Sequence, residues 1–170
     1  MVESRELHRA ALDVARSVVV QVEPHQLGWP TPCSQWDVLA LLRHMVDGNE
    51  LVAAGARGLA PVECDEAALT HDPASVYAAS ADAAVAGFAL DGALDRRYTL
   101  PFAAVSGHLF VRMRTTDQLA HSWDLARALR RSCPPAAELY AAALLFSRER
   151  FASSGRNSAS FEAEQPAPTE

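Results

Sequence analysis

Apolar residues recur at helical spacing over much of the chain, which predicts mainly helices. In residues 4–22 they return every three or four positions until Pro24 closes the segment. The stripe expected to face the core there is Leu7, Ala11, Val14, Val18 and Val22. A second helix is expected through "VLALLRHMVDGNELVAAGA", after the stretch "SQWD" in which Ser34 and Asp37 resemble a capping box.

Three more segments carry the same spacing and predict helices at about 74–90, at about 107–130, and from Pro135 to about Ser153. Residues 59–73 mix turn and acidic residues and predict a loop. The stretch "DGALDRRYTLPFAAVSG" breaks the helical period and predicts an extended crossover, with a short strand at "RRYTL". This order predicts an all-α fold: a four-helix bundle with one long crossover connection and an additional C-terminal helix.

Length and composition fit one domain with a proper core. The chain has 170 residues, of which 49% are hydrophobic and 7% aromatic, and abundant alanine favours helix over sheet. We expect residues 1–155 to form the helical domain and the polar stretch 156–170 to be a mobile tail.

Charge and cysteine usage narrow the functional classes. The formal net charge of -6 argues against a nucleic-acid binder, which needs clustered basic residues. The sequence shows neither a signal peptide nor an apolar run long enough to span a membrane. Three widely spaced cysteines, an odd number, indicate a reducing cytoplasm rather than a disulfide framework.

The stretch "TTDQLAHSWDLARAL" contains the candidate chemistry. Asp117 and His121 are four residues apart, so they share one helix face, and there they interrupt an apolar stripe. An isolated carboxylate in an apolar core costs several kcal/mol. A divalent cation compensates for that cost, because it binds an ionised carboxylate and a neutral imidazole together.

The expected second helix offers a further ligand in His44, which borders its apolar stripe. His44, Asp117 and His121 would leave at least one coordination position open, as catalytic sites do. Two imidazoles and one carboxylate suit Zn²⁺, Ni²⁺ or Fe²⁺, and Zn²⁺ is taken as the first candidate. The competing interpretation is a metal-free bundle in which the three side chains only hydrogen-bond to one another.

Two motifs resemble a known family. "PTPCSQWDVLALLRHMV" followed by "DQLAHSWDLARAL" is similar to actinobacterial proteins related to mycothiol-dependent maleylpyruvate isomerase, within the DinB-like bundle superfamily. The resemblance covers roughly residues 5–155. It implies a four-helix bundle with a divalent metal on His44, Asp117 and His121. The isomerase has a glutamate where this chain has Asp117, and none of its substrate-binding arginines can be placed here.

The resemblance also implies a low-molecular-weight thiol such as mycothiol as cosubstrate, and a small-molecule substrate. The leading functional hypothesis is therefore a metal- and thiol-dependent transferase or isomerase acting on a small electrophile. A non-catalytic metal-binding protein and a metal-dependent hydrolase of a small amide or ester remain open. A homodimer is an option, because bundle relatives pair through helix faces. No catalytic residue is assigned.

Some neighbouring residues admit two interpretations. Asp124, three residues after His121, is either an acceptor for the imidazole of that ligand or one half of an exposed salt bridge. Gly48 either leaves room for a ligand or is a packing contact. Trp36 and Trp123 are expected to anchor the core. The histidines that fit no metal geometry are expected at the surface or in loops: His8, His25, His71 and His108.

Overall fold

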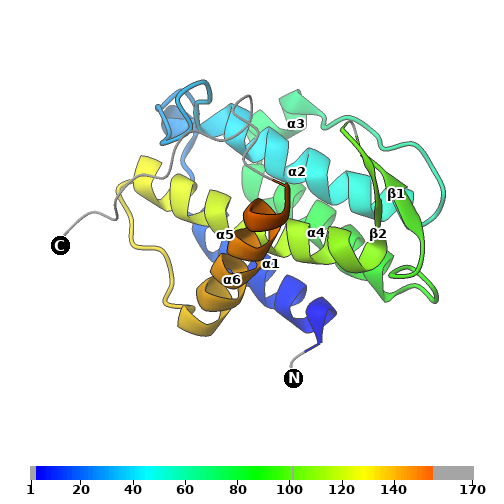
Figure 1. The fold of residues 1–170 in the computed structure, drawn as a ribbon. Coiled ribbons are helices and arrows are strands. Elements are labelled where there is room, and N and C mark those ends of the chain that lie inside the picture. Colours follow the sequence, from blue (N-terminus) through cyan, green and yellow to red (C-terminus); the bar gives the residue numbers. More distant parts are fainter. Residues whose placement is uncertain (1–2, 101, 155–170) are drawn as a thin grey trace.

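The computed structural model describes residues 3–100 and 102–154, and this part of the chain is mostly helical (Figure 1). The α-helices are α1 (Ser4–Val19), α2 (Val38–Gly55), α3 (Glu66–His71), α4 (Pro73–Ala89), α5 (Gly107–Ala128) and α6 (Ala137–Ser154). A 3-10 turn, η1, covers Pro24–Gln26. Strands β1 (Arg97–Thr99) and β2 (Ala104–Ser106) pair antiparallel, with Tyr98 opposite Val105.

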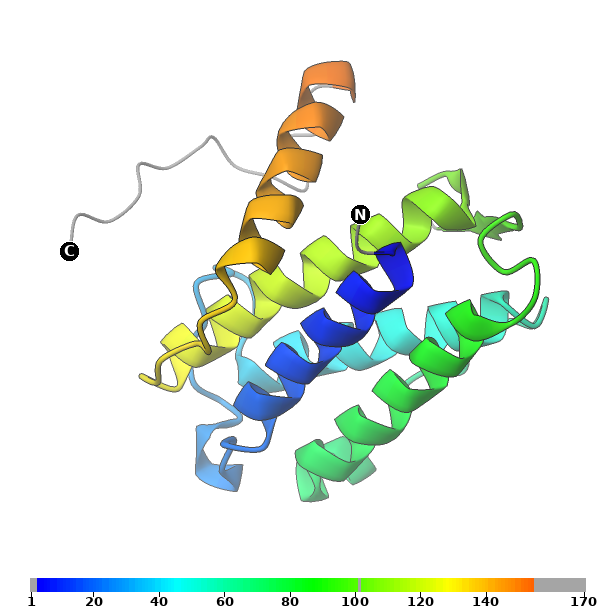
Figure 2. The same ribbon diagram turned by 90° about the horizontal axis from the view of Figure 1, so that it is seen from below.

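The long helices α1, α2, α4 and α5 pack around two apolar clusters. Helix α1 contacts α4 and α5, and α2 contacts the same two helices. Helix α6 packs mainly against α5, and Figure 2 shows it reaching beyond the other helices. The larger cluster includes Leu12, Leu41 and Leu42. The smaller includes Phe88 and Phe110 and lies where the two-stranded sheet meets the helices.

The start of α2 places His44 and differs from the expected capping box. Helix α2 begins at Val38, and Asp37 alone is its N-cap: its carboxylate accepts a hydrogen bond from the Ala40 amide at 2.8 Å. Ser34 therefore does not begin the helix. A short polar side chain at this position satisfies one of the amides that the first turn leaves without a partner.

Two further elements depart from the sequence-based expectations. Helix α3 occupies part of the expected loop 59–73, since the Asp65 carboxylate accepts hydrogen bonds from two first-turn amides and Leu69 is fully buried. The strand expected at "RRYTL" is present, and β2 is an unexpected partner for it. The expected tail 156–170 lies outside the described residues. Across residues 3–100 and 102–154, no helix combines the length and apolar character that crossing a membrane requires.

Gly107, the first residue of α5, provides a test of how this helix is seated. Its amide donates to the Arg96 carbonyl at 2.8 Å, and a Cβ there would overlap the backbone of Ala93 and Leu94. We expect Gly107→Ala to destabilise the fold by about 1–3 kcal/mol, because backbone atoms would have to shift. Thermal melts should show a midpoint lower by on the order of 5 °C. Gly28→Ala is the control, since that Cβ would meet nothing within 4 Å; equal melting of the two variants would contradict the close packing.

Candidate metal centre

Helices α2 and α5 bring His44, Asp117 and His121 together. Asp117 Oδ1 lies 3.3 Å from His44 Nε2 and 3.6 Å from His121 Nε2. Each of the three residues offers one ligand atom, and these three atoms all lie within 4.8 Å of one another. The side chains predicted as ligands thus converge on one point between two helices. Metal binding itself stays a prediction.

The second nitrogen of His121 faces a different group. His121 Nδ1 lies 3.0 Å from Asp124 Oδ2, and since a carboxylate only accepts, the imidazole donates this hydrogen bond. Cys33 Sγ lies 3.5 Å from the same oxygen. Asp124 therefore contacts the imidazole, as one of its two interpretations expects. Cys33, His121 and Asp124 also meet the distance requirement for a cation site.

A buried arginine holds the other side of the Asp117 carboxylate. Arg114, one turn earlier on α5, donates from Nη1 to Asp117 Oδ2 at 2.8 Å. Its Nη2 lies 3.4 Å from the Met45 carbonyl on α2. The Arg114 side chain is only 7% exposed, against 28% for Asp117. One oxygen of the Asp117 carboxylate therefore faces the Arg114 guanidinium, and the other faces the two imidazoles.

These contacts shift the pKa values of two of the three residues. Burial alone raises the pKa of Asp117, but the Arg114 charge and the hydrogen bond with His44 outweigh it and hold the pKa well below its ordinary value. Burial lowers the pKa of His121, but hydrogen bonds with Asp124 and Cys33 and the Asp117 charge raise it to about 10. In the metal-free protein the centre therefore holds an ionised carboxylate against an imidazolium.

Trp36 covers the two imidazoles. Its ring centroid lies 4.7 Å from that of His44 and 5.7 Å from that of His121. The His44 side chain is 36% exposed and the His121 side chain 15% exposed. The centre therefore lies near the surface, with one imidazole accessible to solvent and a tryptophan packed against both.

The structure corrects two expectations near the centre. Trp123, expected to anchor the core, is 44% exposed, and the Arg127 guanidinium lies over its ring. His8, expected at the surface or in a loop, is buried in α1 and packs edge-on against Phe88. The other three histidines of that group are exposed, as expected: His25, His71 and His108.

Sequence reasoning missed Arg114. The available signal is its position three residues before Asp117, which places both on one helix face. The space near Gly48, considered for a ligand, is filled instead by the Arg114 guanidinium. The contact between Arg114 and Gly48 does not follow from either helix alone, because it joins α5 to α2.

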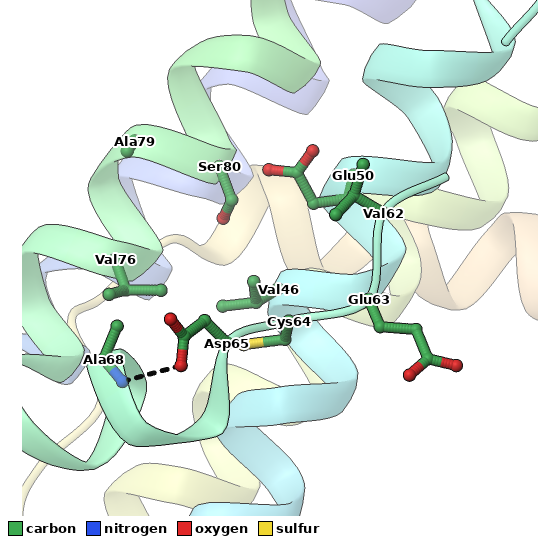
Figure 3. A pocket seen from close by; sticks show the side chains of 10 residues that line it. All are labelled: Val46, Glu50, Val62, Glu63, Cys64, Asp65, Ala68, Val76, Ala79 and Ser80. Atoms are coloured by element: carbon green, nitrogen blue, oxygen red, sulfur yellow. Dashed lines mark hydrogen bonds between the residues drawn. The ribbon is translucent and has the colours of Figure 1, made fainter. Parts of the chain in front are cut away.

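A cavity of about 330 Å³ lies elsewhere, beside α2, α3 and α4 (Figure 3). Apolar side chains such as Val46 and Val76 line it, and its acidic lining residues are Glu50, Glu63 and Asp65. None of the three predicted metal ligands is among its lining residues. The converging imidazoles and carboxylate therefore belong to a separate part of the molecule.

Comparison with known proteins finds relatives in Mycobacterium tuberculosis. Two uncharacterized proteins, one from strain CDC 1551 / Oshkosh and one from strain ATCC 25618 / H37Rv, are each 40% identical to this chain over 123 residues. The matched region is 71% of this chain and 64% of each relative, so it spans less than two thirds of the relatives' length. No protein-family model and no solved structure matches the chain.

Proposed function

We propose that this chain is a divalent-metal-binding protein in which His44, Asp117 and His121 hold one cation, with Zn²⁺ as the first candidate. The observation that carries the proposal is the convergence of a carboxylate oxygen and two imidazole nitrogens from α2 and α5. In a tetrahedral zinc site with bonds of roughly 2.0–2.1 Å, neighbouring ligand atoms lie about 3.3 Å apart. The separations of 3.3 and 3.6 Å from Asp117 Oδ1 are close to that spacing.

The fold that accompanies this proposal is a DinB-like four-helix bundle built from α1, α2, α4 and α5. The mutual packing of these helices supports it, as do the long connection between α4 and α5 and the extra helix α6. The resemblance of two sequence motifs to proteins related to maleylpyruvate isomerase also supports it: one motif leads into α2 and the other lies on α5.

The chain's own residues prepare this centre in distinct ways. Asp124 accepts the Nδ1 proton of His121, which directs Nε2 of that imidazole toward Asp117. Trp36 packs against both imidazoles, and the exposed edge of His44 leaves an approach for a small ligand. Three protein ligands leave a coordination position for that ligand.

The proposed reaction class follows from the resemblance together with this open position. A bound divalent cation would supply Lewis acidity, which lowers the pKa of a thiol placed against it. We propose a low-molecular-weight thiol such as mycothiol as the cosubstrate, in transfer to, or isomerisation of, a small electrophile. The S–H bond breaks, its proton passes to solvent, and the sulfur forms a bond to an electrophilic carbon. In transfer, the leaving group departs from that carbon with the bonding electron pair. In isomerisation, the thiolate adds to a carbon–carbon double bond and is expelled again after rotation about the resulting single bond.

Elemental analysis of protein purified without an affinity tag tests the metal proposal. We expect near-stoichiometric zinc, and a higher melting temperature of the zinc-loaded protein when mycothiol is added, with no such shift after chelation. Absence of any bound metal, together with failure to bind added zinc, would show the proposal to be wrong. Bound metal without a thiol response would favour a non-catalytic metal-binding protein, and thiol-independent cleavage of a small ester would favour a hydrolase.

A further inference from the structure

Arg114 is an unusual residue to find beneath the proposed centre. Its guanidinium is almost fully buried, and its Nε has no hydrogen-bond partner among the described residues. Burying a cation with one donor unsatisfied is unfavourable. The hydrogen bonds that it does make join Asp117 on its own helix to the Met45 carbonyl on α2. The arginine thus connects the two helices that supply the predicted ligands.

Helix α2 accommodates this guanidinium through a glycine. Gly48 lies one turn after His44, and a Cβ there would overlap Cζ and both Nη atoms of Arg114. Glycine in the interior of a helix is less favourable than alanine. A buried arginine on α5 and a helix-interior glycine on α2, each unfavourable by itself, therefore meet at a single contact. The arginine at this contact is the one that donates to Asp117 Oδ2.

The two oxygens of the Asp117 carboxylate have different partners. Oδ2 accepts the hydrogen bond from Arg114, whereas Oδ1 faces the imidazoles of His44 and His121. We propose that Arg114, seated against Gly48, is a positioning residue that makes Asp117 a one-oxygen ligand of the cation. This inference rests on the proposed function. A carboxylate released from the guanidinium can turn and offer both oxygens, which fills a further coordination position.

Cobalt substitution makes the coordination visible. Co²⁺ can replace Zn²⁺ in such donor sets, and its visible absorption weakens and shifts as the coordination number rises above four. We expect Arg114→Met and Gly48→Ala to give the same weaker, shifted absorption per bound cobalt. The first variant removes the guanidinium and the second displaces it while keeping its charge. Arg114→Lys retains a donor for Oδ2 and should return the spectrum toward that of the wild type.

The matched controls are Arg112→Met and Gly28→Ala. Arg112 is an exposed arginine on the same helix paired with Glu149, and Gly28 has open space around it; both variants should keep the wild-type cobalt spectrum. Circular dichroism checks folding, and if Arg114→Met does not fold, Gly48→Ala and Arg114→Lys decide. Wild-type spectra in Arg114→Met and Gly48→Ala would overturn the inference and leave the proposed function standing. A wild-type protein that binds no cobalt, zinc or other divalent cation would overturn both.

Discussion

Replacing His121 with alanine should reduce the metal content of the purified protein from near-stoichiometric to background. His121 occupies the middle of the centre: Nε2 faces Asp117, and Nδ1 faces Asp124. Its loss leaves two ligands on two different helices, too few to hold zinc tightly. Circular dichroism of the same preparation checks that the helices keep their packing, because the His121 side chain is only 15% exposed.

Metal affinities of further variants distinguish the ligands from the residues that only contact them. Asp124→Asn should retain metal but with affinity lower by about 10–100-fold, because the amide no longer provides the carboxylate that orients and activates the imidazole. His108→Ala is the control, since this exposed histidine lies next to Asp95 and outside the centre. Unchanged metal content in His121→Ala would show that His121 is not a ligand. Equal affinities of Asp124→Asn and wild type would remove Asp124 from the centre.

The sequence could predict those features of the centre that lie within a single helix, but not those that depend on how two helices pack. The pairing of Asp117 with His121 needs only the period of one helix, and both side chains do share a face of α5. Placing His44 beside them needs the relative position of two helices, which periodicity does not supply. His44 was a candidate because it borders the apolar stripe of its own helix, and the resemblance added support. The role of Arg114 depends on the missing side chain of Gly48, a contact visible only in three dimensions.

The first helix shows a different limit. Alanine and valine occur on several of its faces, so the apolar stripe could be drawn in more than one position. The expected stripe began at Leu7, whereas the residues that are buried in α1 are His8, Ala11, Leu12, Ala15, Val18 and Val19. That set has helical spacing too, and it includes a histidine. Polarity alone suggested an exposed position for His8, and packing against Phe88 overrode it.

The buried position of His8 should make the stability of the protein depend on pH. Burial, reinforced by the nearby Arg114 charge, lowers the pKa of His8 from 6.5 to about 3. Between these two values the unfolded chain binds a proton that the folded chain does not, so stability falls as the pH falls below 6.5. The contribution is about 1.4 kcal/mol per pH unit, or about 2 kcal/mol at pH 5. His8→Leu removes this contribution.

Denaturant unfolding of the metal-free protein at pH 7.5, 6, 5 and 4 would measure the effect, with a chelator present so that metal binding adds nothing. We expect the free energy of unfolding of His8→Leu, minus that of the wild type, to increase as the pH is lowered. The His108→Leu control alters an exposed histidine and should follow the wild type at every pH. Other groups titrate in all three proteins, so only the difference between variants carries the signal. If the His8→Leu and wild-type curves run parallel, the imidazole of His8 is protonated as easily in the folded state as in the unfolded chain.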